Sequence, residues 1–265
     1  MARDIIDDRL IGALHLRALS RAGLAKDAAL DHVAYQAGTL SSLMGGAFDG
    51  DLPLADLLAH GNMGIGTVAA LAGELIIVDA MAFVIEADGN VCCPDPAVTS
   101  PFAVVCAFAP HHQFAITEAT TLAAVCRRID EVVSRPDSIV AVRIDGRFRN
   151  VAVRSVARQH PPYPTLAEVT AHQTQWRIDS LSGSVVGFRF PDTVAAIDVP
   201  GHHLHVISDD RLAGGHLLDL EIEQANVYLD VSSELHLELP VGVQLGPPGE
   251  ADRESIARIE GQHRS

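Results

Sequence analysis

Apolar residues recur at helical spacing in three stretches of the first half of this chain. Leu30, Val33 and Ala37 predict a short helix followed by a loop within residues 27–45. Residues 52–60 predict a second short helix, and residues 120–133 predict an amphipathic one with its apolar side chains on one face.

Short β-rich runs occupy much of the remaining first half. Residues 75–78 and 83–85 precede a hairpin turn at residues 88–90, and the apolar run 102–108 predicts a buried strand. Glycines at positions 61, 64 and 66 predict a loop. Residues 138–144 and 148–156 predict a hairpin around Asp145-Gly146.

The second half is dominated by predicted strands. The stiff segment His160–Pro164 is the best candidate for a domain boundary, and a short helix is expected over residues 165–174. Closely spaced strands, separated by turn residues, predict an antiparallel sheet or a small barrel. These strands cover residues 184–190, 195–198, 203–207, 216–223, 226–231 and 235–239.

Composition excludes several classes of protein. The chain has 265 residues, 48% of them hydrophobic, which is enough for a substantial core. Its net charge of -15 disfavours nucleic-acid binding, and an anionic substrate would need a local arginine. There is no apolar run of membrane-spanning length and no signal-peptide pattern. Four cysteines without C-x-x-C spacing predict free thiols in a reducing cytoplasm.

The segment around residue 203 carries the clearest chemical pattern. On a strand, His203 and His205 point to the same side, and a turn-rich stretch leads to His216 at the start of the next strand. A hairpin would bring the three imidazoles together, and three such ligands suit zinc with one position open for water or substrate. We expect His202 to face away from the metal.

Other interpretations of these residues remain open. The histidines also suit solvated strand positions, or a metal-stabilised ligand-binding domain without catalysis. His203 and His205 with Asp209 suit a cupin-like iron(II) oxygenase site. The glycine pattern of residues 64–69 fits the letters of a dinucleotide fingerprint, but the surrounding pattern lacks its strand and crossover helix.

The motif Gly201-His202-His203-Leu204-His205, followed by Gly214-Gly215-His216, resembles that of the acetolactate decarboxylase family. The similarity covers roughly residues 30–240. Further matching blocks occur in the same order along the chain, at residues 35–36, 48–50, 60–67, 73–75, 143–146 and 153–156. Two positions depart from the family pattern: His202 replaces a tyrosine, and Ala80 replaces the glycine after Asp79.

This resemblance implies a two-domain α/β (α+β) homodimer. A mixed-sheet, dimerising N-terminal domain would cover residues 1–160, and a β-rich domain carrying the zinc site would cover residues 161–265. The implied reaction converts (S)-2-acetolactate into (R)-acetoin and carbon dioxide.

The resemblance also assigns roles to individual residues. It implies that His203, His205 and His216 bind Zn²⁺, and that Thr67 lies near the substrate. The implied catalytic residues are Glu74, Arg154 and a C-terminal glutamate, Glu260 or alternatively Glu254. Zinc would stabilise an enediolate, the arginine would hold the carboxylate or the oxyanion, and one positioned acid would protonate the product carbon.

Overall fold

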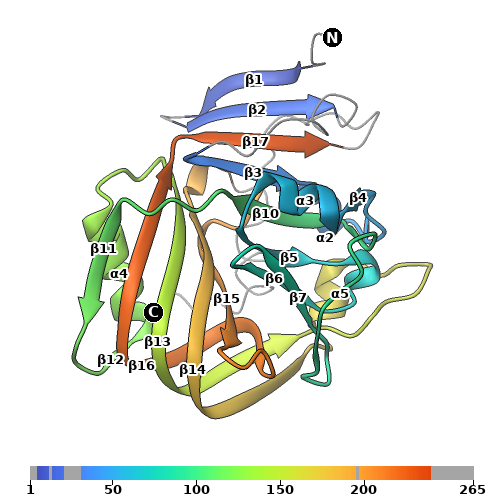
Figure 1. Ribbon diagram of the computed structural model, residues 1–265. Coiled ribbons are helices and arrows are strands. Elements are labelled where there is room, and N and C mark those ends of the chain that lie inside the picture. Colours follow the sequence, from blue (N-terminus) through green and yellow to red (C-terminus); the bar gives the residue numbers. More distant parts are fainter. Residues whose placement is uncertain (1–4, 12–13, 21–30, 195–196, 240–265) are drawn as a thin grey trace.

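The computed structural model describes residues 5–11, 14–20, 31–194 and 197–239, and it has a β-rich α+β fold with several sheets (Figure 1). The largest sheet contains nine strands in the order β1-β2-β17-β3-β10-β5-β6-β7-β8. It is a mixed sheet, because β17 runs parallel to both β2 and β3 while the other pairs are antiparallel. The bounds are β1 (Ile5–Ile11), β2 (Leu14–Ser20), β3 (Val33–Ala37), β5 (Met63–Thr67), β6 (Glu74–Val78), β7 (Met81–Ile85), β8 (Val91–Cys92), β10 (Phe102–Cys106) and β17 (Glu234–Leu239).

The second sheet contains six antiparallel strands, and four of them close into a ring. β13 pairs with β14 and β16, and β15 pairs with the same two strands. This agrees with the expected antiparallel sheet or small barrel for the strands up to β16, whereas the predicted strand at residues 235–239, β17, belongs to the nine-stranded sheet. The bounds are β11 (His112–Ile116), β12 (Thr120–Thr121), β13 (Ile139–Ser155), β14 (Thr174–Phe190), β15 (Gly201–Ser208) and β16 (Gly214–Ser232). A separate pair consists of β4 (Leu52–Pro53) and β9 (Thr99–Ser100).

Short helices connect and cover the sheets. α4 (Leu122–Val132) confirms the predicted amphipathic helix, with Val125 and Ile129 buried. α5 (Leu166–Thr170) begins with a capping box in which Thr165 and Glu168 exchange hydrogen bonds. The others are α2 (Leu40–Met44), α3 (Leu54–His60) and the 3₁₀ turns η1 (Ala69–Leu71) and η2 (Asp192–Val194).

Two predictions for the first seventy residues were wrong. Residues 33–37 form β3 instead of a helix, because this segment is inserted between β17 and β10 and is nearly all buried. Residues 63–67 form β5 instead of a loop. Their glycines allow close contact with β10, since a Cβ on Gly66 would lie 2.3 Å from the carbonyl oxygen of Phe102.

The predicted hairpin around Asp145-Gly146 was also wrong, because β13 continues without a turn from Ile139 to Ser155. A Cβ on Gly146 would lie 2.4 Å from the carbonyl oxygen of Gln224, so this glycine permits close strand approach. Residues 216–231 likewise lie in one strand, β14 begins ten residues before the predicted position 184, and residues 197–198 are not in a strand. Residues 195–196 lie outside the described residues.

Strands from both sides of residue 160 contribute to each of the two large sheets. β17 joins the nine-stranded sheet, and β11 to β13 join the six-stranded one. The division into domains at residue 160 stays a prediction.

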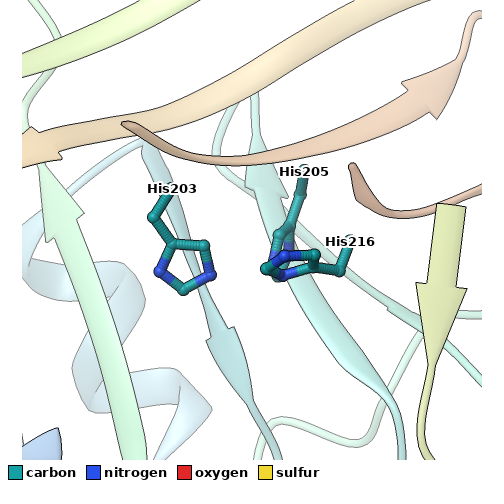
Figure 2. Close-up of side chains that lie close together, drawn as sticks. All are labelled: His203, His205 and His216. Carbon is teal, nitrogen blue, oxygen red and sulfur yellow. The ribbon is translucent and has the colours of Figure 1, made fainter. Parts of the chain in front are cut away.

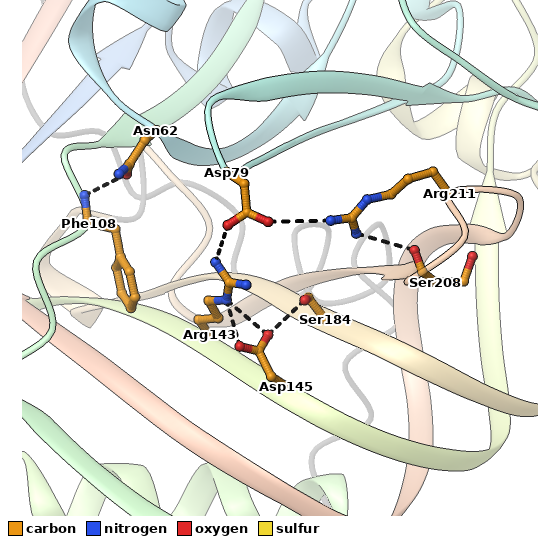
Figure 3. A network of polar contacts seen from close by, with 8 residues as sticks. All are labelled: Asn62, Asp79, Phe108, Arg143, Asp145, Ser184, Ser208 and Arg211. Carbon is orange, nitrogen blue, oxygen red and sulfur yellow. Dashed lines mark hydrogen bonds and ion pairs between the residues drawn. The ribbon is translucent and has the colours of Figure 1, made fainter.

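A polar network connects the two sheets at the β6–β7 turn (Figure 3). Asp79 accepts a hydrogen bond from Arg143 Nη1 at 2.7 Å and lies 3.4 Å from Nη2 of Arg211. The Nε atom of Arg143 also donates to Asp145, which accepts a further hydrogen bond from Ser184. The turn of one sheet is therefore fixed against β13, β14 and the β15–β16 loop of the other.

The four cysteines are free thiols, as expected. None of the helices in the described part of the chain is long and apolar enough to cross a membrane.

Candidate metal centre

The closed ring of strands brings the three predicted histidines together. His203 and His205 lie on the same face of β15, and His216 lies near the start of β16. His205 is directly opposite His216 in the β15–β16 pair, and Arg154 of β13 is opposite His216 on its other side. Arg154, His216 and His205 are therefore lateral neighbours on three adjacent strands.

The imidazole rings gather around one point (Figure 2). Their centroids are 5.3 Å apart for His203 and His205, 5.0 Å for His203 and His216, and 5.1 Å for His205 and His216. One nitrogen from each ring lies within 4.8 Å of the others, and all three side chains are buried. The sequence thus predicted the grouping correctly, whereas the role of each histidine as a ligand stays a prediction.

His205 has the hydrogen bonding expected of a metal ligand. Its Nδ1 donates to the carbonyl oxygen of Leu75 at 3.0 Å, and its Nε2 is buried without a hydrogen-bond partner. The pKa of His205 lies well below its usual range, mainly because the ring is buried and also because His203 and Arg154 are nearby. The hydrogen bond to the Leu75 carbonyl acts in the opposite direction but is the smaller effect. The ring is therefore neutral, with a lone pair on Nε2, and this arrangement fits a bound zinc ion.

Glu74 and Arg154 form a buried ion pair beside the histidines. Arg154 Nη1 donates to Glu74 Oε1 at 3.0 Å, and the other carboxylate oxygen of Glu74 lies 3.6 Å from His205 Nε2. This second approach is not an ion pair, since the imidazole is neutral. A glutamate that opens a strand usually faces solvent, but Glu74 is only 6% exposed.

Thr67 is opposite Glu74 in the β5–β6 pair and also lies at the site. Its hydroxyl donates to the carbonyl oxygen of Gly73 at 2.8 Å, so it holds the backbone immediately before Glu74. Gly73 has a φ of 121°, and a Cβ there would lie 2.5 Å from the carbonyl oxygen of Ile85. The glycine therefore permits the turn that directs Glu74 inward.

Glu74 and Arg154 line a pocket of about 50 Å³. His203, His216, Glu74, Arg154 and Thr67 supply its polar wall. The rest of the lining is mainly apolar, and the sequence did not indicate it, because these residues come from separate elements with no shared motif. They include Leu40, Leu43, Leu71, Phe102, Val156, Leu166 and Val199.

Two residues considered from the sequence, His202 and Asp209, do not belong to the group of three histidines. His202 points toward α4, where its Nε2 is 3.3 Å from Asp130. Its burial lowers the pKa, but hydrogen bonds to Asp130 and Cys126 outweigh this effect and raise it to about 9. Asp209 is exposed in the turn after β15 and does not belong to the histidine group found among the described residues. Glu254 and Glu260 lie outside the described residues.

Comparison with known proteins identifies relatives over most of the chain. The family model for alpha-acetolactate decarboxylase matches residues 34–245. The alpha-acetolactate decarboxylase of Methanosarcina mazei is 37% identical over 231 residues, which cover 85% of this chain and 80% of that protein. The Klebsiella aerogenes enzyme of the same name is 37% identical over 210 residues, covering 79% and 81%.

Solved structures agree with these matches. The crystal structure of alpha-acetolactate decarboxylase from Bacillus subtilis strain 168 superposes with a TM-score of 0.82 at 31% identity, covering 86% of this chain and 99% of that one. A Staphylococcus aureus protein described as similar to the same enzyme gives a TM-score of 0.78 at 26% identity, covering 86% and 98%. The chain therefore belongs to the alpha-acetolactate decarboxylase family of carboxy-lyases.

Proposed function

We propose that this protein decarboxylates (S)-2-acetolactate to (R)-acetoin and carbon dioxide, with a zinc ion held by His203, His205 and His216. The observation that carries the proposal is the group of three buried imidazoles beside a buried Arg154–Glu74 pair, at a pocket lined by His203, His216, Arg154 and Glu74. The cupin-like alternative loses support, since Asp209 does not join the histidines.

Zinc bound by three imidazoles would supply a Lewis acid that polarises the hydroxyl and ketone oxygens of the substrate. The Leu75 carbonyl accepts from Nδ1 of His205, which would leave Nε2 as the nitrogen that binds the metal. Burial of all three rings keeps water away and strengthens their electrostatic effect on a substrate.

Arg154 is suited to bind the substrate carboxylate or the oxyanion that develops as carbon dioxide leaves. Its planar guanidinium is buried and adjacent to His216 across the β13–β16 pair. On a chain with a net charge of -15, this local cation would attract an acid that the overall surface repels.

Glu74 is the proton donor that we propose among the described residues. A guanidinium favours the ionised form of a neighbouring carboxylic acid. When a substrate carboxylate competes for Arg154, the carboxylate of Glu74 would lose part of that stabilisation and accept a proton more readily. A single donor fixed by the Thr67–Gly73 hydrogen bond would deliver the proton to one face of the product carbon. Glu260 and Glu254 are alternative donors or metal ligands that remain predictions from the resemblance.

The homodimer and the cytoplasmic location also remain proposals. Within the described residues, the nine-stranded sheet ends at β1 and β8, and either edge offers a place where a second copy could extend the sheet. The mass in solution, measured by light scattering, distinguishes a dimer from a monomer.

The direct test of the site is the His205→Ala variant. We expect it to contain one metal equivalent fewer than the parent protein and to form no acetoin. The exposed His172→Ala variant is the control and should retain both metal and activity. An unchanged metal content and normal turnover in His205→Ala would refute the proposed centre.

A further inference from the structure

A second group of potential metal ligands lies away from the pocket, at the other end of β16. It consists of His32, His111 and Asp230, whose nitrogen and oxygen atoms lie within 4.8 Å of one another. Asp230 is near the last residue of β16, whereas His216 of the pocket is near its first. The two groups are therefore distinct.

Asp230 is placed between the two imidazoles. Its Oδ1 is 2.6 Å from Nδ1 of His32 and 3.7 Å from Nδ1 of His111. Ligands bound tetrahedrally to zinc at 2.0–2.1 Å are separated by about 3.3 Å. The two observed separations bracket this value, so small side-chain rotations would allow an ion to replace the proton between His32 and Asp230.

The carboxylate of this group is buried and held in place, whereas its two histidines are open to solvent. Asp230 is only 1% exposed, and its Oδ2 accepts a hydrogen bond from the backbone N–H of Ala109 at 2.9 Å, which fixes the carboxylate. The side chains of His32 and His111 are 48% and 42% exposed, so solvent can reach their ring nitrogens. Their rings meet edge to face, with centroids 5.1 Å apart.

We propose that His32, His111 and Asp230 bind a second divalent metal ion of the zinc class. Two imidazoles and one carboxylate suit zinc, nickel or copper better than magnesium or calcium, which prefer oxygen ligands. The three residues come from distant segments, and three protein ligands leave a further position for water.

The second ion would tie the two large sheets together. His32 immediately precedes β3 of the nine-stranded sheet, while Asp230 belongs to β16 of the six-stranded sheet. His111 lies in the connection from β10 to β11, which passes from one sheet to the other. An ion bound to all three would raise thermal stability without touching the substrate pocket.

The test uses chelator-treated full-length protein titrated with Zn²⁺ alone, with metal content measured after dialysis. We expect two equivalents for the parent chain and one for the double variant His32→Asn with His111→Gln, which should keep its acetoin activity. Asparagine suits position 32, because the backbone there has a φ of 59°. His172→Ala, which removes an exposed histidine elsewhere, should still bind two equivalents.

The His205→Ala background separates this site from the proposed catalytic one. There, we expect one remaining zinc equivalent, accompanied by a rise in Tm of about 3 °C. Adding His32→Asn and His111→Gln should abolish both the binding and the rise. Equal zinc content in the parent chain and the double variant would overturn the proposal whether or not the protein makes acetoin.

Discussion

The β6–β7 turn allows a stability prediction whose sign and size follow from backbone geometry. Val78 pairs with Met81, so Asp79 and Ala80 form a two-residue connection, and both have positive φ values of 53° and 61°. Two-residue turns of this kind favour Asp-Gly, because glycine has no Cβ to resist a positive φ. We therefore expect Ala80→Gly to stabilise the protein.

The magnitude is the difference between two effects. Left-handed backbone costs a residue with a Cβ about 1–2 kcal/mol, whereas the greater freedom of glycine in the unfolded chain costs about 0.4–1 kcal/mol. The net gain is about 0.5–1 kcal/mol, or a rise in Tm of about 1–4 °C for a chain of this size. The hydrogen bond from the Ala80 amide to the Asn62 carbonyl oxygen, 2.9 Å long, needs no side chain and should persist.

Urea and thermal unfolding at fixed protein concentration measure the effect. Ala82→Gly is the matched control, since Ala82 lies two residues further on within β7. Glycine inside a strand should lower the free energy of unfolding by about 0.5–1 kcal/mol. Opposite signs for the two variants would support the reasoning. Equal destabilisation by both would refute it.

Three further predictions concern the pocket. Arg154→Ala should keep its metal but lose about 100-fold or more in kcat/KM, since a preorganised donor is removed. The control variant Arg149→Ala, which changes an exposed arginine on the same strand, should alter neither metal content nor kcat/KM. Unchanged turnover in the Arg154 variant would exclude Arg154 from the mechanism. Chelation should abolish activity while the far-ultraviolet circular dichroism stays that of a folded protein; unfolding would instead indicate a structural metal. Thr67→Val should remove the hydrogen bond to Gly73, lower stability by about 1–2 kcal/mol and reduce kcat more than it changes KM; an unchanged kcat would separate Thr67 from the placement of Glu74.

The metal group was predictable from the sequence because its spacing has a direct structural meaning. Alternate residues on a strand share a face, which placed His203 beside His205, and the intervening turn returned the chain at His216. The position of Arg154 beside the histidines could not be predicted from residue spacing in this way. Its contact with the site depends on the pairing of β13 with β16 across more than sixty residues of sequence.

Strand lengths and buried strands were the weaker predictions. β3 and β5 are surrounded by other strands, so their burial leaves no alternation of polar and apolar residues to detect. Gly146 suggested a turn, yet it permits close approach between β13 and β16 within a continuous strand. Glycine has both uses, and only the identity of the neighbouring strand distinguishes them.

The most direct test of the proposed function is acetoin formation from racemic 2-acetolactate by protein of known metal content, with and without chelator. We expect acetoin release that the chelator abolishes and that added Zn²⁺ restores. Folded, zinc-loaded protein that forms no acetoin would contradict the proposed function.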